Sequence, residues 1–234
     1  YIIYPRWTIE GPPTSSVALT DPSREESRVD AVIVNSYDRN CSLQSGTDAQ
    51  YYETLWYVTG NVKARFDGPR MSTVKAYTPI YGGDGADVSL VGVEVNGTQC
   101  QQGGAVLMST GTLVVNQSVI TDTYAVRGGA IFSEHSTNPD PGVDLGLWVD
   151  GSKFIGCSAH SDGGAIMSFD GTLHVVDSDF EQCSIGSGLE DDTFGSAIGV
   201  EGYNQPEWTQ YLVDGCTFDE NVCKDFGRRN DTNL

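Results

Sequence analysis

Gly128-Gly-Ala-Ile131 is one of four copies of a motif that indicates how this chain folds. The other copies are Gly103-Gly-Ala-Val106, Gly163-Gly-Ala-Ile166 and the divergent Gly195-Ser-Ala-Ile198. Successive copies begin 25, 35 and 32 residues apart. Such a repeat is typical of a solenoid, in which each repeat is one unit that buries its apolar face only by stacking on its neighbours.

A second element recurs between the glycine pairs. It is clearest in Phe154-Ile-Gly-Cys157, Phe180-Glu-Gln-Cys183 and Phe218-Asp-Glu-Asn221, and Val95 and Val119 begin looser copies. The residue five positions before this Phe or Val is apolar in every copy, and the residue seven positions before it is apolar in most. The two are two residues apart, so both would lie on one face of a strand. These columns are Leu90, Val114, Val149, Val175 and Val213, and Val88, Thr112, Leu147, Leu173 and Tyr211. Three positions earlier stand residues that favour turns: Gly92, Asn116, Gly151, Asp177 and Gly215.

The two elements together predict an all-β fold, a right-handed parallel β-helix over residues 86–223. Stacking at the inter-strand spacing of ~4.8 Å would bury a continuous core. The paired glycines would form a tight corner where a Cβ would clash. A β-sandwich is the alternative, and the agreement of the two elements argues against it. Two inward files are expected: Val95, Val119, Phe154, Phe180 and Phe218, and Ile131, Ile166 and Ile198.

The remaining segments lack the repeat. Residues 1–85 are predicted to form a cap over the end of the solenoid, extra degenerate coils or a small separate β domain. The cap is preferred, because an open end invites edge pairing. Residues 224–234 are predicted to be a polar tail, and the chain is expected to be a mature product or a piece of a longer one. Strand-like runs in the first segment are Val29–Val34, Leu55–Val62 and Thr73–Ile80, and the aromatic residues expected to plug the core are Trp7, Tyr51, Tyr52 and Trp56.

The charge of the chain excludes several classes of partner. The formal net charge is −19, and residues 86–223 contain twenty Asp and Glu against Arg127 and Lys153 alone. Such a surface repels nucleic acid and anionic lipid. There is no apolar run of eighteen residues, so we expect no membrane insertion. Calcium, glycans and basic proteins stay as candidate partners.

Six cysteines without a Cys-x-x-Cys pair favour disulfides over zinc ribbons or redox motifs. Register predicts a bond between Cys157 and Cys183, which both lie three residues after the inward Phe. Cys216 and Cys223 are seven residues apart and form the next predicted pair, which leaves Cys41 with Cys100. The alternative for Cys157 and Cys183 is a pair of reduced, stacked small hydrophobes.

Glycosylation sequons point to the same oxidising compartment. They begin at Asn40, Asn96, Asn116 and Asn230. With the cysteines, they predict a secreted or cell-surface protein that follows the secretory pathway.

Candidate catalytic and metal-binding residues are sparse. A uronate lyase would need a basic clamp, and Arg127 and Lys153 lie at different points of the repeat. A glycoside hydrolase needs convergent carboxylates. Asp177 and Asp179 are two apart and would share one face, with His174 nearby. We interpret them as a solvated face and expect no catalytic residue, cofactor or resident metal.

Two histidines and one glycine-rich turn are further candidates for metal binding. His135 falls in an insertion, and His160 in a loop before a glycine pair. The turn Tyr81-Gly-Gly-Asp-Gly-Ala-Asp87 weakly matches calcium-binding turns. A plain turn and surface histidines are the preferred interpretation.

The Gly-Gly-Ala-Ile and Phe-x-x-Asn elements resemble the repeats of polymorphic outer-membrane-protein adhesins of chlamydiae. They also resemble long β-helix surface proteins of algae and other protists, within the pectin-lyase-like superfamily. The resemblance covers about Val88 to Asn221, and Cys157 and Cys183 depart from it by replacing the Asn. It implies an elongated extracellular scaffold used in adhesion, filaments or coats.

We therefore expect a non-enzymatic extracellular structural or adhesive protein. Its partners would be other subunits or further segments of the same longer chain. A polysaccharide-active lyase or hydrolase and a carbohydrate-binding β-helix module are the alternatives.

Overall fold

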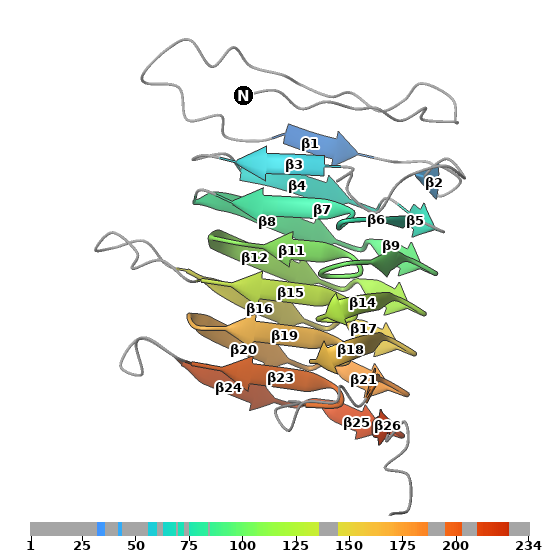
Figure 1. The fold of residues 1–234 in the computed structure, drawn as a ribbon. Helices are drawn as coiled ribbons and strands as arrows, with labels where there is room; N and C mark the ends of the chain where they lie inside the picture. The colour runs from blue at the N-terminus through green and yellow to red at the C-terminus, as the bar shows by residue number, and fades with distance from the viewer. Residues whose placement is uncertain are drawn as a thin grey trace, which may run out of the picture.

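The computed structural model of the protein is all-β and built from parallel sheets. It describes residues 32–35, 42–43, 56–59, 63–68, 70–72, 75–83, 85–135, 145–186, 195–202 and 210–224, and these contain strands and turns but no helix. The strands lie in four parallel sheets, A to D. Figure 1 shows the strands layered in chain order, from β1 at one end to β26 at the other.

Sheets B and A have seven strands each. Sheet B contains β1 (Val32–Asn35), β4 (Lys63–Asp67), β8 (Ala86–Val91), β12 (Gly111–Asn116), β16 (Gly146–Asp150), β20 (Thr172–Val176) and β24 (Tyr211–Asp214). Sheet A contains β2 (Ser42–Leu43), β5 (Arg70–Ser72), β9 (Glu94–Asn96), β13 (Val119–Thr121), β17 (Lys153–Ile155), β21 (Asp179–Glu181) and β25 (Thr217–Asp219).

Sheets D and C have six strands each. Sheet D contains β6 (Lys75–Ala76), β10 (Gln99–Cys100), β14 (Tyr124–Arg127), β18 (Ser158–Asp162), β22 (Ser184–Gly186) and β26 (Val222–Lys224). Sheet C contains β3 (Trp56–Thr59), β7 (Ile80–Gly83), β11 (Val106–Met108), β15 (Ile131–Glu134), β19 (Ile166–Phe169) and β23 (Ile198–Glu201).

From β4 onward the chain visits the sheets in the fixed order B, A, D, C, and we call one such circuit a coil. From β7 onward, each strand pairs in parallel with the corresponding strand of the coil before it. In sheet B, for example, Leu113 pairs with Leu147 and Leu147 with Leu173. This topology is compatible with a parallel β-helix, because each of these strands is bonded to the same element one circuit earlier.

Four of the five residues that were predicted to stack in one inward row lie in register in sheet A. Val95 stacks in register on Ile120, which continues to Phe154 and then to Phe180 and Phe218. The rings of Phe154 and Phe180 are 4.9 Å apart and almost parallel, and those of Phe180 and Phe218 are 5.0 Å apart. The stack explains why phenylalanine recurs at this position.

The prediction of Val119 in this file is wrong by one residue. Val119 pairs with Lys153 on the outer face, and Ile120 is completely buried instead. Because successive strand residues point to opposite faces, a slip of one exchanges inside for outside. The same slip puts Leu113 and Val115, in place of Thr112 and Val114, in the inner columns.

That slip comes from the corner before β13. Gln117, and not Asn116, adopts the left-handed backbone conformation there, with φ of 47°. Gly92, Gly151, Asp177 and Gly215 do so at the same corner of other coils.

The paired glycines form the predicted tight corner between sheets D and C. Gly128 has φ of 57°, which favours a residue without a Cβ. A Cβ on Gly129 would lie 2.0 Å from the carbonyl oxygen of Gly164, in the next coil. The second glycine is therefore required by the close approach of neighbouring coils. The predicted file after this corner is also confirmed, since Ile131 pairs with Ile166 and Ile166 with Ile198.

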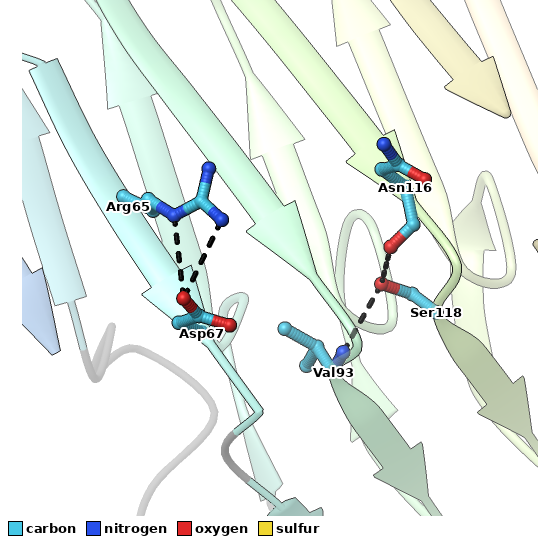
Figure 2. A network of polar contacts seen from close by, with 5 residues as sticks. All are labelled: Arg65, Asp67, Val93, Asn116 and Ser118. Atoms are coloured by element: carbon cyan, nitrogen blue, oxygen red, sulfur yellow. Dashed lines mark hydrogen bonds and ion pairs between the residues drawn. The ribbon is translucent and has the colours of Figure 1, made fainter. Parts of the chain in front are cut away.

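Serines form a hydrogen-bonded ladder at the corner between sheets B and A. Ser118 Oγ accepts the Val93 N–H at 3.1 Å and donates to the Asn116 carbonyl at 3.0 Å, as Figure 2 shows. Ser152 Oγ accepts the Ser118 N–H in turn, and Ser178 Oγ accepts the Ser152 N–H. Each hydroxyl satisfies a buried amide of the previous coil, which would otherwise be costly to bury.

The four sheets extend to the N-terminal side of residue 86. β4 to β7 form a complete coil that pairs with the next, and Trp56 of β3 packs edge-on against Phe66 at 5.7 Å. β3 lies within the expected run Leu55–Val62, whereas β4 and β5 were not anticipated because charged side chains alternate with apolar ones there. Trp7, Tyr51 and Tyr52 lie outside the described residues.

Candidate functional site

The two basic residues between positions 86 and 223 lie in different sheets, and both interact with acidic side chains. Arg127 in β14 is 3.4 Å from Asp162, and its guanidinium lies over the Phe169 ring at 5.5 Å. Lys153 in β17 forms an ion pair with Asp179 at 2.8 Å. The arrangement links neighbouring coils and does not gather the two cations at one point.

The candidate carboxylate pair is separated by a corner. Asp177 has φ of 47° between β20 and β21, while Asp179 begins β21. The expectation that both share one strand face is therefore wrong, because the backbone turns between them. Asp179 also accepts a hydrogen bond from Thr217 at 2.6 Å. The hydrogen bonds from Lys153 and Thr217 lower the pKa of the Asp179 carboxyl, which keeps it ionised.

His174 belongs to a different surface, the outer face of sheet B. It lies edge-on to Trp148 of the preceding coil, with ring centroids 6.2 Å apart. A Cβ on Gly146 would lie 2.8 Å from Trp148 Cη2, so the indole lies over a residue that has no side chain. Trp148 is partly exposed. The result is an aromatic platform on the sheet, which the sequence analysis missed.

A buried polar cluster was also missed. His135 directly follows β15 and is 5% exposed, so its predicted place in an insertion is wrong. Its Nε2 lies 2.9 Å from Ser133 Oγ, and Asp170 contributes a nearby negative charge. Burial lowers the pKa of His135 to about 4, against the smaller opposing effect of Asp170. The alternation of a strand could have indicated this burial, because Ile131 points inward and Ser133, two residues later, lies on the same face.

The cluster pairs a hydroxyl with an imidazole, as a nucleophile and its base are paired in hydrolases. Ser133 is completely buried, however, and faces the core. Its oxygen cannot contact a polymeric substrate, so we interpret the Ser133–His135 pair as part of the packed interior.

Cys157, Cys183, Cys216 and Cys223 have free thiols in the structure. The disulfides between Cys157 and Cys183 and between Cys216 and Cys223 stay predictions. The predicted register of the first pair is correct, since Phe154 pairs with Phe180 and Ser158 with Ser184. The alternative interpretation, a pair of reduced, stacked small hydrophobes, also stays a prediction. Cys41 lies outside the described residues, which leaves its pairing with Cys100 a prediction.

Two of the four sequon asparagines lie in the described residues. Asn96 ends β9 and is exposed, whereas Asn116 ends β12 and its side-chain oxygen is enclosed. Both lie at strand ends, one residue earlier than a loop. Asn96 therefore offers the better site for a projecting glycan. Asn40 and Asn230 lie outside the described residues.

The candidate metal ligands are dispersed. Asp87 forms an ion pair with Lys63 at 3.5 Å, and His160 is exposed within β18 and not in a loop as predicted. Within the described ranges, no group of three or more His, Cys, Asp or Glu is placed to hold a metal ion. Nor is any helix there long and apolar enough to cross a membrane.

Known proteins provide no further guide to the site. No protein-family model, curated protein or solved structure matches this chain. The case for function therefore depends on the geometry of the coils.

Proposed function

We propose that the protein is a non-enzymatic extracellular structural or adhesive scaffold, a right-handed parallel β-helix within a larger surface, filament or coat assembly. The observation that carries the proposal is the unbroken inner file of sheet A. It runs through successive coils from Met71 to Phe218. A core of this kind gives a stiff rod whose length grows with the number of coils.

Several features support this proposal. A right-handed path is the rule for parallel strands joined by crossovers. The serine ladder, the stacked phenylalanine rings and the paired glycines all join one coil to the next. These residues therefore stabilise a regular stack of coils. The complete coil β4–β7 favours extra coils over a separate domain for that part of the N-terminal region. The same glycine-rich repeats are the ones that resemble adhesin and protist surface β-helices.

The surface suits an extracellular setting. Twenty acidic residues between 86 and 223 keep such a rod soluble and repel anionic polymers. Exposed Asn96 at a strand end provides a place for a glycan that would not interrupt the stack. Other subunits or further segments of a longer chain are the proposed partners.

Incubation with pectate, alginate and neutral glycans tests the proposal. We expect no release of reducing or unsaturated ends. Cleavage that disappears in Asp177→Ala or Asp179→Ala would overturn the structural assignment. Electron microscopy of natural material should show the protein in a fibre or coat.

A second candidate is a carbohydrate-binding module, favoured by the platform of Trp148 over Gly146. Aromatic rings with nearby polar groups are common in ligand sites, and Thr172 and His174 flank this one. The negative surface favours neutral sugars over uronates. A glycan array with the protein and with Trp148→Ala tests this, and binding that survives the substitution would exclude the platform.

A further inference from the structure

Asn96 differs from the other asparagines of the chain in the residue that follows it. The chain has ten asparagines, and only Asn96 directly precedes a glycine, Gly97. An asparagine loses its side-chain amide most readily before glycine, because glycine has no Cβ to obstruct the approach of its backbone nitrogen. Asn96 is exposed at the end of β9, so water reaches its side chain. Its reactivity therefore depends on the backbone around it.

Loss of the amide is a balanced two-step reaction. The backbone nitrogen of Gly97 attacks Cγ of Asn96, and the new C–N bond closes a succinimide ring. The bond between Cγ and Nδ2 breaks, and Nδ2 leaves as ammonia with the proton of the Gly97 amide. Water then opens the ring at either carbonyl, which gives aspartate or isoaspartate at position 96.

The stacked coils withhold the attacking nitrogen. The Gly97 N–H donates to the Thr121 carbonyl of the next coil at 3.1 Å. Asn96 pairs in register with Thr121, which keeps its own backbone extended. Gly97 has φ of 67° and forms the corner between sheets A and D. Ring closure requires the Gly97 nitrogen to lose its hydrogen bond and ψ of Asn96 to leave the β range.

The residue after the glycine is held as well. Thr98 is completely buried, and its Oγ1 donates to the Gly104 carbonyl. The Thr98 carbonyl accepts the Tyr124 N–H of the next coil at 2.9 Å. Residues 96–98 are thus fixed by separate backbone and side-chain contacts. Their backbone can rearrange only through a local opening that breaks these contacts.

We infer that Asn96 is a deamidation site that reacts only while residues 96–98 are detached from the next coil. Stacking of β9 and β10 on β13 and β14 suppresses ring closure, and local opening restores it. Isoaspartate adds a methylene group to the main chain at the end of β9, so the product no longer matches the register of β13. This inference does not depend on the proposed scaffold function.

Peptide mapping by mass spectrometry tests the inference on protein made without glycans, since a glycan would substitute the leaving Nδ2. The full chain and a peptide of residues 92–101 are incubated side by side at mildly alkaline pH. We expect the folded chain to react at least about tenfold more slowly, because an opening free energy of ~1.4 kcal/mol already gives that factor. The chain unfolded in urea should react at the rate of the peptide in urea. Equal rates in the folded chain and the peptide would overturn the inference.

Hydrogen exchange of the Gly97 amide measures the same opening independently. Exchange and ring closure both require the Gly97 nitrogen to leave the Thr121 carbonyl. The factors by which folding slows the two reactions should therefore agree within about threefold. Deamidation that proceeds while the Gly97 amide stays protected would show a route without opening and refute the inference.

Two matched variants locate the opening. Thr98→Val removes the hydroxyl that donates to the Gly104 carbonyl and should accelerate deamidation of Asn96 several-fold. Thr78→Val removes an equally buried hydroxyl of the preceding coil, which donates to the Gly103 carbonyl at 3.0 Å, and should leave the rate unchanged. Circular dichroism checks that both variants are folded. Equal acceleration by the two variants would assign the reaction to unfolding of the whole chain and contradict a local opening at residues 96–98.

Discussion

Cys157 and Cys183 occupy the same position in adjacent coils, and both side chains are completely buried. Burial raises the pKa of the Cys157 thiol well above its usual range, which keeps it protonated and unreactive in the folded protein. Neighbouring strands lie ~4.8 Å apart. That spacing is within the roughly 4.4–6.8 Å between Cα atoms that a disulfide needs.

We therefore expect this pair to form a disulfide when the protein is refolded with oxidised glutathione, and to do so slowly once folded. Peptide mapping by mass spectrometry under non-reducing conditions measures this. A preference of Cys157 for any other cysteine would show that the coils are stacked in another register.

Acid should weaken the fold through His135. Its pKa falls from the ordinary histidine value of 6.5 to about 4 on folding, because burial disfavours the imidazolium. Between these values the unfolded chain binds more protons than the folded one, so stability decreases as the pH falls from about 6.5 to about 4. The loss from this group is about 3 kcal/mol.

Denaturant unfolding at pH 7, 5 and 4 tests this expectation. His135→Gln should flatten the pH dependence in that window, although the variant will itself be less stable. His160→Gln changes an exposed histidine and should leave the dependence unchanged. Identical slopes for the wild type and His135→Gln would refute the assignment.

Loss of the central ring of the phenylalanine stack should be costly. Phe180 is fully buried between Phe154 and Phe218. Phe180→Ala should lower the unfolding free energy by about 3–5 kcal/mol through lost burial and a cavity. Phe218→Ala should cost about 1 kcal/mol, because half of that side chain is exposed. Equal losses in chemical denaturation would mean that the end of the stack is covered in solution.

The second glycine of the repeated pair should tolerate no side chain. In Gly129→Ala the Cβ would meet the Gly164 carbonyl, and we expect a loss of at least about 3 kcal/mol. Gly92→Ala is the matched control, because its Cβ would meet nothing within 4 Å. There only the positive φ is strained, at about 1 kcal/mol. Thermal unfolding of the two variants should rank them in that order, and the reverse order would contradict the packing described.

The inner files were predictable because stacking repeats the same environment every coil. Phe154, Phe180 and Phe218 share one position, and so do Ile131, Ile166 and Ile198. Val119 was misplaced because its coil lacks the aromatic marker and two apolar residues, Val119 and Ile120, stand side by side. Only the backbone turn at Gln117 determines which of the two points inward.

The candidate sites were harder to predict, since they join residues that different coils contribute. The contact of Trp148 with His174 and the ion pair of Lys153 with Asp179 depend on register between coils of unequal length. The burial of His135 depends on the corner that follows β15. None of these relationships is visible in the local sequence.

The sequence by itself determined that this chain is a repeated, all-β structure, because glycine pairs and alternating apolar residues encode corners and strands locally. It also determined that Cys157 and Cys183 become neighbours, since each lies three residues after the inward phenylalanine of its own coil. The tertiary structure alone decided that the four strands of each coil enter four separate sheets and that Ile120, and not Val119, points inward. The physical reason is that a repeat specifies how coils stack, while the backbone turn at each corner determines which side chain of a strand points inward.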